Sequence, residues 1–503
     1  MIIWLAVFAA LWLGALVFFS THSFKKNKGD QDYLFAGSGL GSMIGLLTFA
    51  ATLFSTFTFM GMPDFFRTHG VGAWIFLGVS DAVMFFFILW FGHRLRARGA
   101  ARGFQGMSRL VADCYGRKWT GILYLVAVFI FLIPYVSIQV RGISIFLSAV
   151  FPGALPFWGW ACLIVVTMLV YSEIGGLRAI IYSDSLQALV LLLALWLIAL
   201  GCLHKIGGVQ AMFEQVKAIQ PELLSTPGPK GLMGFQFLIT ACFAVMMIPA
   251  TQPQVSTRLI IMRDTRKLHR MAVALGVFAF LVLVPTIFIG FYGSIHYNGA
   301  PTQEFLSKVL LFEQANWVAA LVVIGLLAAA ISTADSQIFA LGTELRSVLP
   351  DGAKHGMRIT RLAIMGFGTC ALLFSIFSSD QFALLATLSF KGTSLLGPMI
   401  LCAIFSHKTP HQSIAWVTAG ALLVFIGSLV KVPMFAVNFI QSQSWLGHLD
   451  RWTSFTKGFF VPKALAPFQV GTLEIPPLQT SLLMMIVVTG YALALCWRPF
   501  AKR

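Results

Sequence analysis

The sequence predicts an all-α integral membrane protein with about thirteen transmembrane helices, on two observations. Of its 503 residues, 58% are hydrophobic and only 11% are charged, whereas soluble domains carry roughly 25% charged residues. A helix needs about 20 apolar residues to cross a bilayer, and thirteen apolar runs approach or exceed that length. They lie near residues 2–20, 40–62, 72–93, 120–150, 156–171, 184–204, 232–255, 271–295, 317–344, 359–378, 381–405, 412–432 and 476–497.

Basic residues predict how these spans are oriented. The chain has a formal net charge of +17, and most of its lysines and arginines lie in short loops, such as RLIIMRDTRKLHR at 258–270. Because such residues gather on the cytoplasmic side, we expect the N-terminus outside and the C-terminus in the cytoplasm. The location expected is the plasma membrane, the inner membrane of a bacterium. The surroundings are the lipid bilayer, and no nucleic-acid partner is predicted.

Both ends of the chain are expected to extend a central core. Run 2–20 lacks the basic start and the small-residue cleavage site of a signal peptide, so it is predicted to stay as a helix. With the cytoplasmic linker after it, this helix forms an extension at 1–38. Residues 406–503 are expected to add C-terminal helices and a long outer loop at 433–475, which its aromatic residues place along the membrane interface.

Two of the predicted spans carry features that interrupt a helix. Residues 40–63 crowd small and hydroxyl side chains at their centre, and residues 240–258 contain Pro249 and Pro253. Proline removes helical hydrogen bonds, and irregular backbone survives in a bilayer only where it faces protein or water. The two runs are the second and the seventh, five apart, which is typical of a transporter built from two inverted five-helix repeats. The predicted repeats span 39–204 and 205–405.

The ninth run holds a polar cluster in its middle. On a helix, Ala329, Ser332, Thr333 and Ser336 share one face. Neutral oxygen ligands at this density suit a small cation, and they favour Na⁺ over Ca²⁺ or Mg²⁺. The alternative for any single hydroxyl is a bond within its own helix or to a neighbouring helix. Asp335 favours a functional site, because ionisable groups inside a membrane are costly.

Four segments resemble the sodium:solute symporter family, in the order that this family has them. AAAISTADSQ is similar to its sodium-binding helix, and GLGSMIGLLTFAATLFSTFTFMGMP to its first core helix. YSEIGGLRAIIYSDSLQ resembles a loop signature of the family, and ATQPQVSTRLI resembles the end of its sixth core helix. The resemblance runs from about residue 30 to about residue 405. It implies a LeuT-like 5+5 inverted-repeat core with discontinuous first and sixth core helices.

The resemblance also implies where sodium binds. The ligands would be the backbone carbonyls of Ala51, Phe54 and Ala329 and the hydroxyls of Ser332 and Thr333. Some members have a second sodium site, and its positions here are Asp184, Asp335 and Ser336. A serine is usual where this chain has Asp335, so this carboxylate is expected either to strengthen a second cation site or to carry a proton.

The solute is expected in a central pocket between the interrupted helices. The resemblance implies Thr58, Gln139, Gln252 and Gln254 as residues that contact it, with interhelical hydrogen bonds as the alternative for each glutamine. Tyr135 and Gln139 are four residues apart, so they are expected to share one helix face.

Two cationic side chains, Arg141 and Lys391, fall within predicted spans. A buried cation is costly unless it is paired, so either one facing the pocket would favour an anionic solute, and arginine suits a carboxylate better. The alternatives are that Arg141 reaches outward to the membrane surface, and that Lys391 pairs with Asp335 or another acid.

Together these features predict a sodium-coupled secondary active transporter, a symporter that imports a small organic solute by alternating access. The solute is expected to be an organic acid or an amino acid, and Na⁺ is the expected coupling ion. Two alternatives stay open: a proton-coupled carrier, and a transporter-like sensor that binds solute without net flux. Neither an enzyme nor a cofactor is predicted, because the ten histidines lie mainly in loops without metal-ligand spacing.

Overall fold

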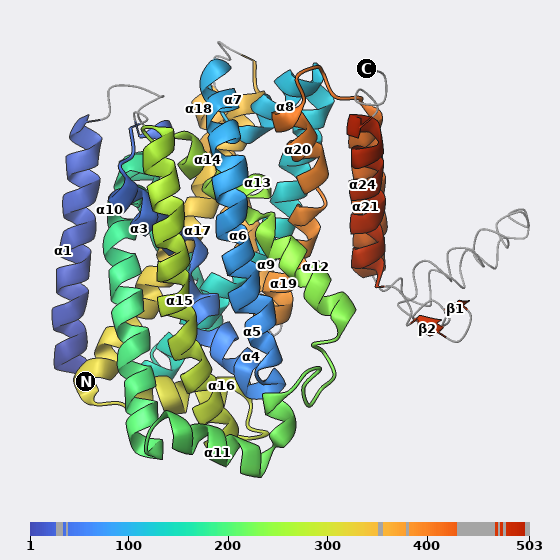
Figure 1. The fold of residues 1–503 in the computed structure, drawn as a ribbon. Coiled ribbons are helices and arrows are strands. Elements are labelled where there is room, and N and C mark those ends of the chain that lie inside the picture. The colour runs from blue at the N-terminus through green and yellow to red at the C-terminus, as the bar shows by residue number, and fades with distance from the viewer. Residues whose placement is uncertain are drawn as a thin grey trace, which may run out of the picture.

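The protein is a bundle of helices that stand side by side, as the computed structural model shows (Figure 1). The structure describes residues 1–26, 34–36, 39–350, 356–378, 382–429, 468–470, 473–475 and 479–497. The N-terminus lies at the lower end of the bundle in Figure 1, and α24 (Thr480–Trp497) ends at its upper end. Most of the predicted outer loop at 433–475 lies outside the described residues. Within it, strands β1 (Phe468–Val470) and β2 (Leu473–Ile475) pair in antiparallel fashion.

The remaining helices follow one another through short connections, and the η labels mark π-helical or 3-10 segments. In the first half they are α1 (Ile2–Lys26), α3 (Ser42–Leu53), η1 (Phe57–Gly61), α4 (Met62–His69), α5 (Gly72–Trp74), η2 (Ile75–Val79), α6 (Ser80–Phe87), η3 (Ile88–Gly92), α7 (His93–Ala101), α8 (Met107–Tyr115), α9 (Lys118–Val150), α10 (Phe157–Ile206), α11 (Val209–Ile219) and η4 (Pro221–Leu224). In the second half they are α12 (Phe235–Met246), α13 (Ile248–Thr251), α14 (Pro253–Ile260), α15 (Thr265–His296), α16 (Thr302–Ser307), η5 (Lys308–Phe312), α17 (Asn316–Val348), α18 (Gly356–Phe377), α19 (Phe382–Ser394), α20 (Gly397–Phe405) and α21 (Ser413–Leu429).

Eight helices in the described part of the chain are long and apolar enough to cross a membrane. The bent pair Ser42–Leu53 and Phe57–His69 makes a ninth span if it is counted as one. Shorter apolar helices match the remaining predicted runs, at Phe157–Val170, Phe235–Met246, Ser413–Leu429 and Thr480–Leu495. The predicted helical membrane architecture is therefore confirmed, while the count of thirteen spans stays a prediction.

Both predicted interruptions are present in the structure. After α3, Phe54 takes an extended backbone (φ −88°, ψ 123°), and the span turns by 60° into the segment Phe57–His69. The other span breaks at Gln252 (φ −103°, ψ 117°), directly before Pro253. Proline offers no backbone N–H and disfavours helical backbone in the residue before it. The inverted relation between the two repeats stays a prediction.

The two interrupted spans are joined at one end. The backbone N–H groups of Gly39 and Leu40 each donate to the carbonyl of Ile261 at 3.1 Å, and Arg263 N–H donates to the Leu40 carbonyl at 3.0 Å. Leu40 and Met262 thereby form a parallel bridge. The start of α3 is thus tied to the end of α14.

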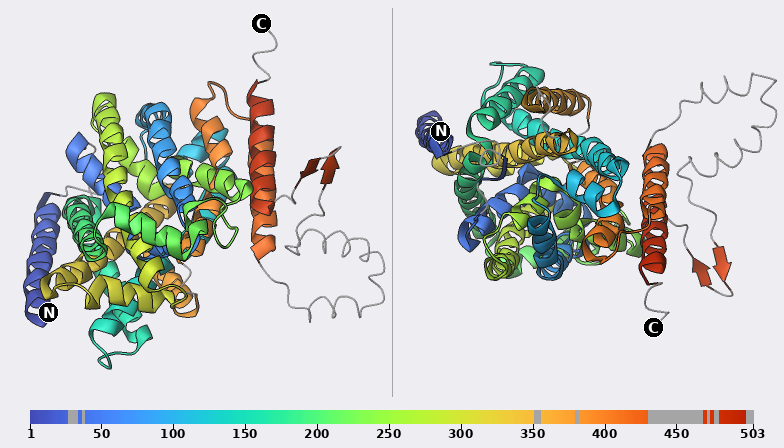
Figure 2. Two further views of the ribbon diagram at one scale, coloured as in Figure 1. Left: turned by 60° about the horizontal axis from the view of Figure 1, so that its bottom comes forward. Right: turned by 90° about the horizontal axis from the view of Figure 1, so that it is seen from above.

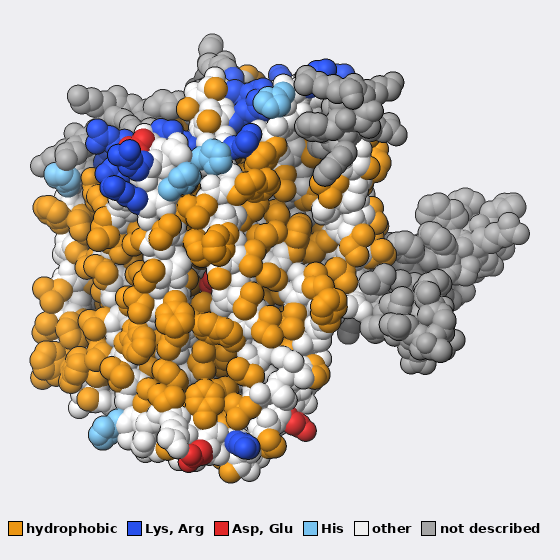
Figure 3. Space-filling model, in the orientation of Figure 1, with side chains coloured by type: hydrophobic (Ala, Val, Ile, Leu, Met, Phe, Trp, Pro, Cys, Tyr) orange, Lys and Arg blue, Asp and Glu red, His pale blue; other side chains and the backbone are white. Residues whose placement is uncertain are grey.

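The surface has an apolar belt and a basic end. Figure 3 shows apolar side chains over the middle of the molecule and lysines and arginines gathered at its upper end, where α7 lies in Figure 1. In the belt, Phe86 is 62% exposed and Trp90 is 52% exposed, as expected for side chains that face lipid. Helix α1 lies at one edge of the bundle and α21 and α24 at the opposite edge (Figure 2). The interrupted spans, α9 and α17 lie between these edges.

Candidate functional site

The polar face of α17 meets the end of α3 at its interruption. The Ser332 hydroxyl donates to the Ala51 carbonyl at 2.8 Å, and the Thr333 hydroxyl donates to the same carbonyl at 3.2 Å. The Ser332 oxygen also lies 3.5 Å from the carbonyl of Ala329. Both hydroxyl-bearing side chains are fully buried. The structure therefore brings together four of the five residues expected to bind sodium.

Phe54, the fifth, is the residue at which α3 ends. Its own N–H still bonds to the Ala50 carbonyl at 2.7 Å, but its extended backbone turns its carbonyl out of the helical pattern. A carbonyl freed in this way can serve as an ion ligand inside a membrane protein. The chain thus supplies neutral oxygens from α3 and from α17, and this donor set fits Na⁺. Among the described residues, no group of three or more His, Cys, Asp and Glu side chains could hold a metal ion.

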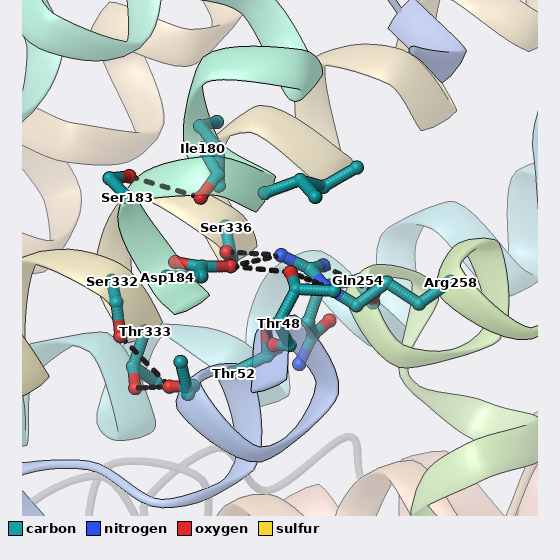
Figure 4. A network of polar contacts seen from close by, with 12 residues as sticks. Thr48, Thr52, Ile180, Ser183, Asp184, Gln254, Arg258, Ser332, Thr333 and Ser336 are labelled. Carbon is teal, nitrogen blue, oxygen red and sulfur yellow. Dashed lines mark hydrogen bonds and ion pairs between the residues drawn. The ribbon is translucent and has the colours of Figure 1, made fainter. Parts of the chain in front are cut away.

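A second polar network centres on Arg258 of α14 (Figure 4). Its Nη2 donates to Asp184 Oδ2 of α10 and to Ser336 Oγ of α17, both at 2.8 Å. Its Nε donates to Thr48 Oγ1 of α3 at 2.9 Å, and the Thr48 hydroxyl donates to Asp184 Oδ2 at 2.8 Å. Its Nη1 donates to the Gln254 carbonyl at 2.7 Å. One guanidinium therefore joins four helices.

Sequence reasoning missed this role of Arg258. It placed residues 258–270 in a basic loop, whereas the structure buries Arg258 in α14 with a side chain that is 2% exposed. The placement of Arg258 in a basic loop was therefore wrong, whereas its place at the end of the interrupted span 240–258 is confirmed. The error arose because the predicted apolar run ends at 255, two residues after Pro253, whereas the helix continues to Ile260. A signal was available, because Arg258 follows Gln254 by one helical turn.

Asp335 lies beside this network without a partner. It is 1% exposed, and within the described structure neither of its carboxylate oxygens has a hydrogen-bond partner. The charged groups that act on it are Asp184 and Arg258. No ion pair joins it to Lys391, whose Nζ lies instead over the ring of Phe237 at 4.8 Å. The alternative of a pair between Asp335 and Lys391 is therefore not realised.

Two of the predicted solute-contacting residues support the interrupted backbone itself. Gln139 Oε1 accepts from Thr56 N–H at 3.0 Å, and Thr58 Oγ1 accepts from Ser55 N–H at 3.0 Å. Tyr135 shares a face with Gln139, as expected, because the side chains of both lie 3.4 Å from Ser55 Oγ. These contacts take over backbone hydrogen bonds that the helix gives up at its break.

The other interruption brings Gln252 and Gln254 into contact. Gln254 Nε2 donates to Gln252 Oε1 at 2.7 Å. Within the described structure, Gln252 Nε2 and Gln254 Oε1 have no partner although both side chains are buried. A buried amide without a partner is costly, so these groups are available to a ligand.

Arg141 is brought to the end of α18. Its Nη1 donates to the Ser375 carbonyl at 2.8 Å, and its guanidinium lies over the ring of Phe157 at 5.1 Å.

Asp81 of α6 is a further intramembrane carboxylate that sequence reasoning missed. It is 7% exposed, and its charge acts on Tyr135 and on Cys242. A lone aspartate inside the apolar run 72–93 was the signal that could have found it.

Curated proteins with similar sequences are bacterial carriers. The chain is 23% identical to a sodium/pantothenate symporter of Haemophilus influenzae over 62% of this chain and 62% of that protein. It is 20% identical to a sodium/pantothenate symporter of Escherichia coli over 86% of this chain and 92% of that protein. It is 24% identical to an osmoregulated proline transporter of Bacillus subtilis, with 82% and 86% covered.

Solved structures show the same fold. A Na⁺-coupled sialic acid symporter in a substrate-bound, outward-open state matches with a TM-score of 0.70 at 17% identity, over 84% of this chain and 90% of that one. A transporter of the nucleobase-cation-symport-1 family, in a closed conformation with bromovinylhydantoin bound, matches with a TM-score of 0.56 at 14% identity, over 93% of this chain and 95% of that one.

The family assignment rests on a match over most of the chain. A model of the sodium:solute symporter family matches residues 33–420. This family consists of transporters rather than enzymes, and together with the relatives it supports Na⁺ as the coupling ion, a small molecule as the solute and a multi-pass protein of the inner membrane. The chain belongs to the sodium:solute symporter family.

Proposed function

We propose that the chain imports a small organic solute, an organic acid or an amino acid, driven by the inward Na⁺ gradient and working by alternating access. The observation that carries this proposal is the contact of the Ser332 and Thr333 hydroxyls with the Ala51 carbonyl. It supports the proposal because it joins neutral oxygens of α3 and α17 at the interruption of α3. Relatives named for pantothenate and for proline support the two solute classes.

Sodium is proposed to hold α3 and α17 together. Its ligands are the carbonyls of Ala51, Phe54 and Ala329 and the hydroxyls of Ser332 and Thr333. When the ion leaves, the two helices lose their common ligand, and the contact between them loosens. A second cation or a proton at Asp184, Asp335 and Ser336 also stays a prediction, and a proton-coupled carrier is the corresponding alternative.

The solute is proposed to bind beside the two interruptions. Its contacts are proposed to come from Thr58, Gln139, Arg141, Gln252, Gln254 and Lys391. The unpartnered amide groups of Gln252 and Gln254 support this proposal. Lys391 adds a cation that lies over an aromatic ring rather than beside an acid, which favours a solute with a negative group.

The orientation is proposed from the charge of the two ends. The basic end of the bundle (Figure 3) faces the cytoplasm under the positive-inside rule. The N-terminus lies at the opposite end (Figure 1) and is therefore outside, and α24 ends on the cytoplasmic side.

A thermal-shift screen of the purified protein tests the proposed solute and ion together. Small carboxylates including pantothenate, amino acids including proline, and sugars are added in NaCl or in KCl of equal concentration. A ligand at a hundredfold excess over its Kd stabilises the folded state by about 2.7 kcal/mol. We expect an organic acid or an amino acid to raise the melting temperature in Na⁺ only. An equal shift in K⁺ would argue against sodium coupling, and a shift with sugars alone would contradict the solute class.

A further inference from the structure

The position of Arg258 bears on how many sodium ions the protein binds. Its Nη2 lies 2.8 Å from Asp184 Oδ2 and 2.8 Å from Ser336 Oγ. These two oxygens belong to the group at which a second cation is predicted. Nη2 therefore already makes, with both oxygens, the contacts that a second sodium ion would make. In this conformation the guanidinium competes with such an ion for Asp184 Oδ2 and Ser336 Oγ.

The rest of the network shows that the guanidinium fits this place well. Thr48 Oγ1 and the Gln254 carbonyl accept from its Nε and Nη1 at 2.9 and 2.7 Å. All four nitrogen–oxygen contacts are thus within normal hydrogen-bond length. Arg258, Asp184, Thr48 and Ser336 are each at most 2% exposed. A buried charge is tolerated when it is paired and hydrogen-bonded, and the carboxylate of Asp184 supplies the pairing charge.

We propose that Arg258 is a built-in cation that takes the place of a second sodium ion, so that this conformation binds a single Na⁺, at Ser332 and Thr333. This inference rests on the proposed function, because it presupposes the sodium site between α3 and α17. It adds that Asp184 and Ser336 bind the chain's own guanidinium. The arrangement also joins α14 to α3 through Thr48, in addition to the backbone bridge between Leu40 and Met262. A movement of α14 away from α3 would withdraw the cation from Asp184.

Neutralising Arg258 should therefore create a second sodium site. In Arg258→Gln, Asp184 Oδ2 and Ser336 Oγ lose the nitrogen that contacts both of them. Within the described structure, Oδ1 of Asp184 and both carboxylate oxygens of Asp335 are buried without a hydrogen-bond partner. The charges of these two aspartates act on each other, so their oxygens can take part in the same site. A carboxylate with hydroxyl neighbours is a hard oxygen site of the kind that binds small cations. The variant Arg258→Lys keeps the positive charge, and Asp184→Asn removes the carboxylate.

The test counts radioactive sodium bound per molecule of purified full-length protein at saturation, with no solute present. We expect one ion for the wild type, two for Arg258→Gln, and one for both Arg258→Lys and the double variant Arg258→Gln/Asp184→Asn. Size-exclusion chromatography checks that each variant is folded. If Arg258→Gln does not fold, the number of sodium ions bound to the wild type still tests whether a second ion binds beside Arg258.

Three results would overturn the inference. Two ions on the wild type would show that Arg258 does not replace a sodium ion, while leaving the proposed sodium coupling intact. A folded Arg258→Gln that still binds one ion would likewise show that Arg258 does not replace a sodium ion, and it would leave the proposed sodium coupling intact. No bound ion on the wild type would contradict both this inference and the proposed function, so the two failures are distinguishable.

Discussion

Replacing Ser332 and Thr333 together by alanine is expected to weaken sodium binding by roughly a hundredfold or more while leaving the protein folded. Both hydroxyls lie on one face of α17 and reach the Ala51 carbonyl. A hydrogen-bonding group that contacts a charge contributes about 1.5–3 kcal/mol, and each 1.4 kcal/mol is about tenfold in affinity. Losing two such ligands should raise the Na⁺ concentration needed for half-maximal thermal stabilisation by roughly a hundredfold or more.

The control for this variant lies on the same helix. Thr343 is also buried in α17, but its hydroxyl donates to the Phe339 carbonyl one turn earlier, at 3.1 Å. Thr343→Ala therefore removes an equivalent hydroxyl without touching the proposed site, and its sodium dependence should match the wild type. Unchanged sodium dependence in the double alanine variant would place the ion elsewhere.

Replacing Gln139 by leucine is expected to destabilise the protein even without solute. Gln139 is fully buried, its Oε1 accepts from Thr56 N–H, and its Nε2 lies 3.4 Å from Ser55 Oγ. Leucine leaves the Thr56 N–H without a partner at the interruption of α3. An orphaned buried donor costs about 1–3 kcal/mol, so we expect a lower melting temperature and little remaining uptake.

Two comparison variants separate support of the backbone from contact with the solute. Gln139→Glu keeps an acceptor for Thr56 N–H and should retain more stability than Gln139→Leu. Gln303→Leu changes an exposed glutamine of α16 and should leave both stability and uptake unchanged. If Gln139→Leu kept wild-type stability and only raised the solute concentration for half-maximal uptake, the proposed contact of Gln139 with the solute would hold and its support of the break would be contradicted.

The oxygen-rich face of α17 could be predicted because it follows from helical spacing alone. Ser332 and Thr333 lie three and four residues after Ala329, so any helix through this run brings them to one side. The interruptions were predictable for a similar reason. Pro253 removes a hydrogen bond wherever it stands, and the structure breaks the span directly before it.

The network around Arg258 could not be predicted in the same way. Asp184 and Arg258 are 74 residues apart, and their meeting depends on how α10 and α14 pack. Periodicity gives the face of each helix but not the register between helices, and several registers satisfy the same apolar pattern. The contacts of Arg141 depend on helix packing too, because its long side chain reaches the Ser375 carbonyl at the end of α18. The same holds for Lys391, which an aromatic ring of α12 contacts.

The ion pair between Arg258 and Asp184 also bears on the role of Asp335. With Asp184 already paired to the guanidinium, the charge of Asp335 has no partner of its own in the described structure. An ionisable side chain inside a membrane is costly, so Asp335 stays the residue at which a proton or a second cation is predicted.

Solute accumulation in sealed proteoliposomes tests the central claim, sodium-coupled import, most directly. A solute that binds in the thermal-shift screen is supplied outside, with an inward Na⁺ gradient or with equal Na⁺ on both sides. We expect accumulation above the outside concentration only while the Na⁺ gradient exists, and none in the Ser332→Ala/Thr333→Ala variant. Binding without accumulation would contradict sodium-coupled import and indicate a sensor. Accumulation driven by a proton gradient without Na⁺ would contradict it and indicate a proton-coupled carrier.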